Sequence, residues 1–348
     1  MKNYQIAGWI LIGLFLTFHL TYAAGYSQDE EGFGKSYLLL PVIVSQPNTG
    51  LAYGGVYLGN LFGTGMIFDH DGHSKFFINK RSYFDDGQFL LLTSASWENW
   101  SSTFYGIGNE DFESPGEDYT GKKAQFASGF LLRLQDGLYF GLTVAANRFS
   151  VSDKETGGQL AGGTIVGSDG ADAVGIGLRL LSDQRDDHVF PTEGSLLDLK
   201  VLFYDPDYGS DQKFSQSTVI FNKFIPAAIG GVLVLQSRIV YSHGDIPFQM
   251  LPSLGDPEIM RGIRVNKDIN RDLLAVSTEY RFSIYQRLTG ATFLGIGDAA
   301  NSFAELQMDK FIGGFGIRYY FTGPFKLFFN KGFSEHDSAA YFGMDASF

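Results

Sequence analysis

Apolar and polar residues alternate with a period of two in short segments that recur from about Tyr37 to the last residue, Phe348. The pattern is clearest in residues 138–147, 197–204 and 311–321, where one face is apolar and the other is small or polar. This period is typical of β-strands that present one face to an apolar environment. A soluble β-sandwich would give the same period, so other features must separate it from a transmembrane β-barrel.

The alternation predicts an all-β fold of about sixteen strands. An even count is typical of a single antiparallel outer-membrane barrel. Fourteen strands remain an alternative. The count of sixteen places residues 63–73 in a periplasmic turn, and periplasmic turns of such barrels are usually shorter. Strands are expected at residues 36–46, 50–61, 74–82, 86–97, 102–109, 122–133, 137–150, 172–182, 195–205, 213–225, 231–242, 272–285, 289–297, 308–321, 324–330 and 340–348.

The N-terminus has the organisation of an export signal. Lys2 precedes an apolar stretch from Ile6 to about Leu20, and small residues follow at positions 23–25. A single membrane anchor is the alternative, although the stretch is short for a spanning helix. No cysteine follows, which excludes a lipid-anchored lipoprotein. We therefore expect a signal peptide at residues 1–24, a short segment at 25–35 and a barrel at 36–348.

The composition favours a barrel over a soluble protein. Hydrophobic residues make up 44% and aromatic residues 16% of the chain, yet no apolar run of spanning length follows the signal. The lipid-facing side of a barrel accounts for this excess. The absence of cysteine removes the disulfide framework of small secreted domains. The net charge of −12 argues against nucleic acid as a partner, because nucleic acid requires a basic surface.

The longer connections lie on one side of the predicted sheet. With both termini in the periplasm, the connections at 110–121, 151–171, 206–212, 243–271 and 331–339 are outside, and several are rich in acidic residues. Those at 134–136, 183–194, 226–230, 286–288 and 322–323 are inside, and most of them are short. This asymmetry is the one expected of an outer-membrane barrel.

The longest outside connection contains Arg261, and the strand that follows contains Glu279. In that strand Val276 and Ile284 belong to the lipid face, so Glu279 and Arg281 point into the lumen. An arginine in a long loop is by default solvated. We nevertheless expect the loop at 243–271 to fold into the lumen, with Arg261 reaching Glu279, because an exposed loop has no need of a matching acid on the inner wall and a partly desolvated ion pair gains more than a surface one.

At this point the chain resembles the Omp85 superfamily, in its bacterial surface antigen (D15) barrel form. The resemblance extends from the seventies to near the end of the chain. It implies a Gram-negative outer-membrane protein that inserts or translocates proteins. Its partners would be outer-membrane lipids, client proteins and other outer-membrane or periplasmic assembly proteins. The residues that carry it are Asp183, Arg185, Asp186, Phe190, Pro191, Thr192 and Gly194 as an inside turn, Arg261, Gly262 and Ile263 as the loop motif, Thr278, Glu279 and Tyr280, and Gly314, Gly316, Arg318 and Tyr319.

The resemblance is incomplete in two places. Relatives have a second lumen acid in the next strand, where this chain reads Phe293 to Gly297, and the nearby Asp298 would face the opposite way. The anchoring of Arg261 would then depend on Glu279 alone. In addition, about a dozen residues separate the signal from the first strand, so we expect a short form without the periplasmic POTRA domains of well-known members.

The first and last strands have features that bear on the seam between them. Pro41 lies in the middle of the first strand and cannot donate a ladder hydrogen bond, which predicts a weak seam. In the last strand, every second residue from Phe342 to Phe348 faces outward, with Gly343 among them. A terminal aromatic residue resembles the signal that barrel-assembly machinery reads on its clients. An ordinary closing strand is the alternative.

Enzymatic motifs are absent from the sequence: there is no G-x-S-x-G, no P-loop and no H-E-x-x-H. His70 and His73, beside Asp69 and Asp71, are spaced closely enough to suggest a metal, but a solvated polar turn explains them as well. We expect no cofactor. Three function classes remain: an insertion or translocation factor or its accessory subunit, a passive pore lined by the same lumen charges, and an outer-membrane enzyme.

Overall fold

A computed structural model gives the fold and describes residues 37–46, 50–59, 62–108, 116–188, 190–320 and 326–345. Four short 3-10 helices lie in the connections: η1 (Pro206–Tyr208), η2 (Ala228–Gly230), η3 (Phe248–Met250) and η4 (Phe303–Glu305). The strands are β1 (Tyr37–Gln46), β2 (Gly50–Gly59), β3 (Phe62–Asp69), β4 (Ser74–Phe84), β5 (Phe89–Phe104), β6 (Glu117–Gln135), β7 (Leu138–Ser152), β8 (Gly170–Asp183), β9 (Gly194–Tyr204), β10 (Phe214–Ala227), β11 (Gly231–Gly244), β12 (Asp272–Tyr285), β13 (Leu288–Ala300), β14 (Lys310–Tyr320), β15 (Lys326–Ser334) and β16 (Ser338–Asp345).

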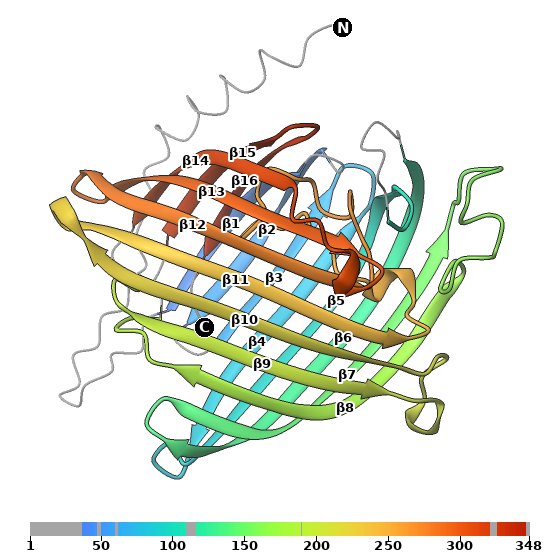
Figure 1. The fold of residues 1–348 in the computed structure, drawn as a ribbon, viewed down its shortest axis with the longest axis horizontal. Coiled ribbons are helices and arrows are strands. Elements are labelled where there is room, and N and C mark those ends of the chain that lie inside the picture. The colour runs from blue at the N-terminus through green and yellow to red at the C-terminus, as the bar shows by residue number, and fades with distance from the viewer. Residues whose placement is uncertain are drawn as a thin grey trace, which may run out of the picture.

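The strands form one antiparallel sheet in which each strand pairs with the next along the chain. The sheet curls on itself, so that β16 lies beside β1 (Figure 1). Among the described residues, no hydrogen-bonded ladder joins β1 to β16. The predicted all-β architecture of about sixteen antiparallel strands is confirmed.

The two faces of the sheet follow the predicted alternation. On β7, Leu142 is 62% exposed, while Tyr139 and Thr143 are buried toward the lumen. On β12, Val276 and Ile284 are exposed and Glu279 is buried, as expected from their parity. Exposed apolar side chains cover the outside, as expected of a barrel whose outer face contacts hydrocarbon. The described part of the chain contains no helix that is long and apolar enough to cross a membrane.

The strand count is right because two errors in the predicted strands cancel. Residues 62–69, taken from the sequence as part of a turn on the short-turn side, form β3. Its glycines hide the alternation, and at Gly65 the ring of Phe77 from β4 occupies the space that a side chain would fill. Conversely, residues 86–97 and 102–109 are not two strands. A single strand, β5 (Phe89–Phe104), runs through most of both ranges, and its polar end still pairs with β6 as far as Glu117.

The connections fall into a long-loop end and a short-turn end, because every strand reverses direction. The described residues 70–73, 105–108, 153–169, 205–213, 245–271, 301–309 and 335–337 follow odd-numbered strands and share the long-loop end. The turns after even-numbered strands are short, except residues 184–193. The placement of residues 63–73 on the short-turn side was therefore wrong, while the grouping of the other long loops agrees with the sheet.

Candidate functional site

The connection between β11 and β12, residues 245–271, lies inside the barrel lumen and is called here the lumen loop (Figure 1, orange). Its apolar side chains Leu254, Ile259, Met260 and Ile263 are buried in one cluster with the inner wall formed by β11 to β14. An exposed loop would leave these side chains in water, so their burial fixes the loop inside. The predicted inward fold of this loop is therefore confirmed.

Arg261 stands at the tip of the lumen loop and reaches the wall of the barrel. Its Nη1 donates a hydrogen bond to Oε2 of Glu279 on β12. The guanidinium carbon lies 3.8 Å from the centre of the Phe293 ring on β13, a close cation–π contact. Both members of the ion pair are almost fully buried. The predicted contact between Arg261 and Glu279 is thus present.

The carboxylate of Glu279 accepts hydrogen bonds from three arginines. Besides Arg261, Nε of Arg281 donates to Oε1 over 2.6 Å, and Nη2 of Arg318 donates to Oε2 over 2.7 Å. A carboxylate removed from water is tolerated only when hydrogen bonds and opposite charges replace its hydration. Glu279 is thus the acid that holds Arg261, as expected from the absence of the family's second lumen acid. One glutamate on the wall of the lumen holds three guanidinium groups together.

Two glycines let the loop tip approach the wall closely. A Cβ on Gly262 would lie 2.5 Å from the carbonyl oxygen of Phe333 and 2.8 Å from Ile312. A Cβ on Gly332 of β15 would overlap the carbonyl oxygen of Arg261 and lie 2.7 Å from the backbone nitrogen of Gly262. Backbone therefore packs on backbone at this point. Ile263, which stands where the family has phenylalanine, is buried beside them.

Further ion pairs tie the lumen loop to its surroundings. Asp256 accepts a hydrogen bond from Arg238 of β11 over 2.8 Å, and Arg264 donates to Asp337 in the β15–β16 turn over 2.9 Å. Asp268 lies 2.9 Å from the amino group of Lys310. Burial raises the pKa of Asp268 to about 6, and the charge of Lys310 opposes that rise.

Asp298 takes no part in binding Arg261. Its Oδ1 accepts a hydrogen bond from Lys310, and its other contacts are with backbone N–H groups of its own loop region. The expectation that it faces away from Arg261 agrees with these contacts. Lys310, placed between Asp298 and Asp268, instead links the β13–β14 wall to the lumen loop.

The inside turn between β8 and β9 is organised by two aspartates. Asp183 accepts two hydrogen bonds of 2.8 Å from Arg185, which folds back over the turn. Asp186 accepts hydrogen bonds from the backbone N–H groups of Thr192 and Glu193. Burial opposes the charge of Asp186, but these bonds and the one from the Thr192 hydroxyl hold its pKa below the ordinary value. These hydrogen bonds join the beginning of the turn to its end.

Aromatic and small residues fit the inside turn against the barrel. Pro191 is buried, and the ring of Phe190 meets Tyr320 of β14 edge-on, with centroids 4.6 Å apart. Gly194 has a φ of +97°, and a Cβ there would collide with the carbonyl oxygen of Gln184. Only glycine fits this position without strain. The motif residues of this turn thus have structural reasons for their identity.

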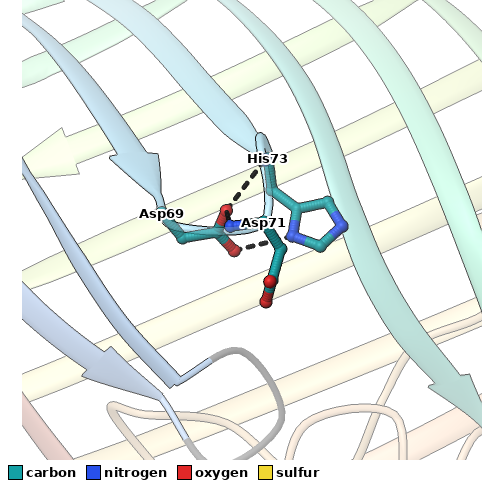
Figure 2. A group of neighbouring side chains, drawn as sticks. All are labelled: Asp69, Asp71 and His73. Carbon is teal, nitrogen blue, oxygen red and sulfur yellow. Dashed lines mark hydrogen bonds and ion pairs between the residues drawn. The ribbon is translucent and has the colours of Figure 1, made fainter.

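A second polar cluster lies in the β3–β4 turn, where Asp69, Asp71 and His73 come together (Figure 2). Oδ1 of Asp69 accepts hydrogen bonds from the backbone N–H groups of Asp71 and His73, and Oδ2 lies 2.6 Å from Nδ1 of His73. Nε2 of His73 lies 3.0 Å from the hydroxyl of Ser101. Because the hairpin itself uses these groups, the cluster is explained as a closed turn and not as a metal site. His70 is fully exposed outside it.

The structure describes two of the three predicted seam residues, Pro41 and Gly343. Pro41 is exposed on β1, opposite Gly55 of β2. Gly343 lies on β16 against the ring of Phe328. Phe348 and the predicted signal peptide lie outside the described residues. Pro41 therefore occupies an edge strand whose only ladder partner among the described strands is β2, which is where proline is tolerated in a sheet.

The sequence did not reveal three partners of the site. Phe293 under Arg261, Gly332 against the loop tip and Asp337 bound to Arg264 were not expected from any motif. The lumen-facing position of Arg318 could be predicted from the sequence, because Arg318 alternates in step with Gly314 and Gly316 on the lumen face. Its contact with Glu279, two strands away, was not predicted.

Comparison with known proteins identifies the family. The Omp85 superfamily domain matches residues 60–317, well over half of the chain. No curated protein sequence matches the chain significantly.

Two solved structures share the fold. The first is BamA from Haemophilus ducreyi lacking POTRA domains 1–3, with a TM-score of 0.60 and 13% identity, covering 98% of this chain and 78% of that one. CdiB from Acinetobacter baumannii has a TM-score of 0.54 and 10% identity, covering 90% of this chain and 59% of that one.

The family assignment decides between the function classes at a coarse level. Omp85 barrels are transport and assembly proteins and not enzymes, so the enzymatic alternative is excluded. Their location is the outer membrane, whose lipids surround the exposed apolar face. The domain match, the sixteen-stranded sheet and the loop arginine held on a lumen acid agree, and the chain belongs to the Omp85 superfamily of outer-membrane β-barrels.

Proposed function

We propose that this barrel inserts or translocates proteins at the Gram-negative outer membrane, or acts as an accessory subunit of such a machine. Its partners are client proteins and other outer-membrane or periplasmic assembly proteins, and the chain itself reaches the membrane through a cleaved signal peptide. The observation that carries this proposal is the lumen loop, which is bound to the hairpin at the seam as well as to Glu279.

The lumen loop is linked to the last hairpin by three contacts. Arg264 binds Asp337 in the turn between β15 and β16. The hydroxyl of Tyr341 on β16 donates to the carbonyl oxygen of Ile263 over 3.1 Å. The loop tip also packs on Gly332 of β15. A change in the position of the loop therefore acts directly on the strands that border the seam.

The seam has a physical reason to open. Unpaired backbone groups are costly at membrane depth, so a barrel is normally sealed by a continuous ladder. Here no ladder joins β1 to β16 among the described residues, and Pro41 removes one donor from the first strand. An opening of this kind would expose strand edges that an incoming client strand can pair with.

A passive pore is the second candidate, because charged side chains line the lumen. Several of them are already paired within the barrel: Arg179 binds Asp198 across β8 and β9, and Arg238 binds the lumen loop. The loop also contacts the connection that follows β5, where the amide of Gly108 donates to the carbonyl oxygen of Ile269. These contacts favour a plugged barrel over an open channel.

Locking the seam tests the proposal. The chain has no cysteine, so a pair introduced by Leu39→Cys and Phe342→Cys, which are both exposed on the lipid face of the two seam strands, can be cross-linked without background thiols. The locked barrel is expected to lose its activity, measured as insertion of a radiolabelled outer-membrane protein into liposomes that contain the purified barrel. Reduction of the disulfide should restore the activity.

The matched control places the same cross-link between two interior strands. Leu199 of β9 and Val219 of β10 lie directly opposite each other, so Leu199→Cys with Val219→Cys joins a pair that a lateral opening does not separate. This variant should keep its activity. Full activity of the seam-locked barrel would reject lateral opening and leave the passive pore as the better account.

The orientation of the barrel gives a further prediction. Gly163 lies in the exposed 153–169 loop at the long-loop end, and Thr192 lies in the inside turn. Epitope tags at the two positions should therefore differ in intact cells, with the tag at Gly163 accessible to antibody and the tag at Thr192 accessible only after the outer membrane is permeabilised. Equal labelling of both tags in intact cells would contradict this topology.

A further inference from the structure

A polar cavity of about 330 Å³ lies in the lumen between the tip of the lumen loop and the inside turn. It reaches the short-turn end, because Pro191 of the turn and Lys326 at the start of β15 belong to its lining. Its basic lining residues are Arg185, Arg261, Arg281, Arg318 and Lys326, and its acidic ones are Glu258 and Glu279.

The charges around this cavity are not balanced. Glu279 is the shared partner of Arg261, Arg281 and Arg318, so one negative charge faces three positive charges. Arg185 is neutralised by Asp183 within the turn. Even with Glu258 counted and Lys326 left out, the three arginines outnumber the two acids of the lining. Like charges held together in a region of low dielectric constant raise the free energy of the folded protein, and a bound anion would lower it.

Some of the arginine donors lack a protein partner. Within the described residues, Nε and Nη2 of Arg261 and Nη1 of Arg318 are buried and make no hydrogen bond to protein. Both side chains are more than nine-tenths buried. Phe293 lies against the guanidinium of Arg261, but the N–H groups of a guanidinium lie in its plane and need acceptors. Buried donors without acceptors are uncommon in folded proteins.

We propose that this cavity binds a small oxyanion, a phosphate or carboxylate group that enters from the short-turn end. Guanidinium groups recognise both groups by paired, charge-assisted hydrogen bonds. The anion would accept the unpartnered N–H groups of Arg261 and Arg318 and offset the excess positive charge. Arg281 and Lys326, which are less deeply buried than Arg261, would contact it near the cavity entrance. This inference does not depend on the proposed function, since binding is measured without any client protein.

The test uses the full chain purified in a neutral detergent. Binding of inorganic phosphate and of acetate is measured by isothermal titration calorimetry, with sodium chloride at the same ionic strength as the reference. The variants are Arg281→Gln and Lys326→Gln, and the control is Arg179→Gln. Arg179 has an exposed fraction like that of Arg281 but binds Asp198 in another part of the lumen. Heat-modifiable mobility on gels shows that each variant is folded.

We expect saturable binding of an oxyanion to the wild-type chain and to Arg179→Gln. Each site variant should weaken it by about tenfold, the effect of losing one hydrogen bond to a charged group. Preference for phosphate or for acetate identifies which of the two groups the site takes. A response equal to that of chloride, or equal affinities in the site variants and the wild type, would overturn the proposal.

Discussion

Replacing Glu279 by glutamine is expected to cost the barrel about 3–5 kcal/mol of stability, the usual effect of removing one partner from a buried ion pair. The reason lies in the geometry of the site, where the carboxylate is the common acceptor of Arg261, Arg281 and Arg318. Glutamine keeps the size of the side chain but leaves three guanidinium groups without their counter-charge. The measurement is urea unfolding of the barrel in lipid vesicles, followed by tryptophan fluorescence.

A double-mutant cycle tests whether the loop arginine and the wall acid act together. Arg261→Gln should also destabilise the barrel, though less than Glu279→Gln, because Arg281 and Arg318 still neutralise the glutamate. The double variant should cost less than the sum of the two single variants. Strictly additive losses would contradict the contact between Arg261 and Glu279.

Asp198→Asn provides the matched control for this substitution. Asp198 is also a lumen-facing acid with two hydrogen bonds from an arginine, but within the described part of the chain both come from Arg179, and its side chain is more exposed than that of Glu279. Solvent screens such a pair more strongly, so its loss should be smaller. A loss for Asp198→Asn equal to that for Glu279→Gln would show that the shared, buried position of Glu279 has no special importance.

Replacing Gly332 by valine is expected to displace the lumen loop and open the barrel to ions. A Cβ at Gly332 would overlap the backbone of Arg261 and Gly262, and a shift of the loop tip to make room for it is expected to pull Arg261 away from Glu279. Overpacking of this kind typically costs about 1–3 kcal/mol, and release of the loop relieves it. The wild-type barrel should show a small, flickering conductance in planar bilayers, and the variant a larger and steadier one.

Gly313→Val separates loop displacement from a general effect of a side chain on the sheet. Gly313 lies on the neighbouring strand β14, and a Cβ there meets Leu294 at 3.2 Å, away from the loop tip. This variant should conduct like the wild type. A large and steady conductance of the wild-type barrel would instead favour the passive pore, because the lumen loop would then not block the channel.

The sequence by itself determined the barrel and much of its site. The period of two assigned the lipid and lumen faces, because strands place successive side chains on opposite sides. Strand parity then grouped most of the long loops at one end, and it placed Glu279, Arg281 and Arg318 in the lumen. Together with the family motif around Arg261, parity was enough to predict the contact between Arg261 and Glu279.

Strand number was determined correctly for partly wrong reasons. The alternation fades where lipid is not in contact with the strand or where glycine lacks a side chain. At Gly65 of β3, Phe77 from the neighbouring strand supplies the missing bulk. The polar end of β5 continues as a strand because β6 pairs with it as far as Phe104 opposite Glu117. Hydrogen bonding between strands, which local sequence does not record, decided both cases.

Only the tertiary structure decided that one glutamate holds three arginines. Glu279 lies opposite Phe293 on β13, and Phe293 lies opposite Gly314 on β14. The small residues on this wall leave space for Arg318 to reach across from β14, two strands away. Register sets these neighbours, and register results from pairing along whole strands. The sequence therefore gives the face on which a charge lies, while the fold determines which charges meet.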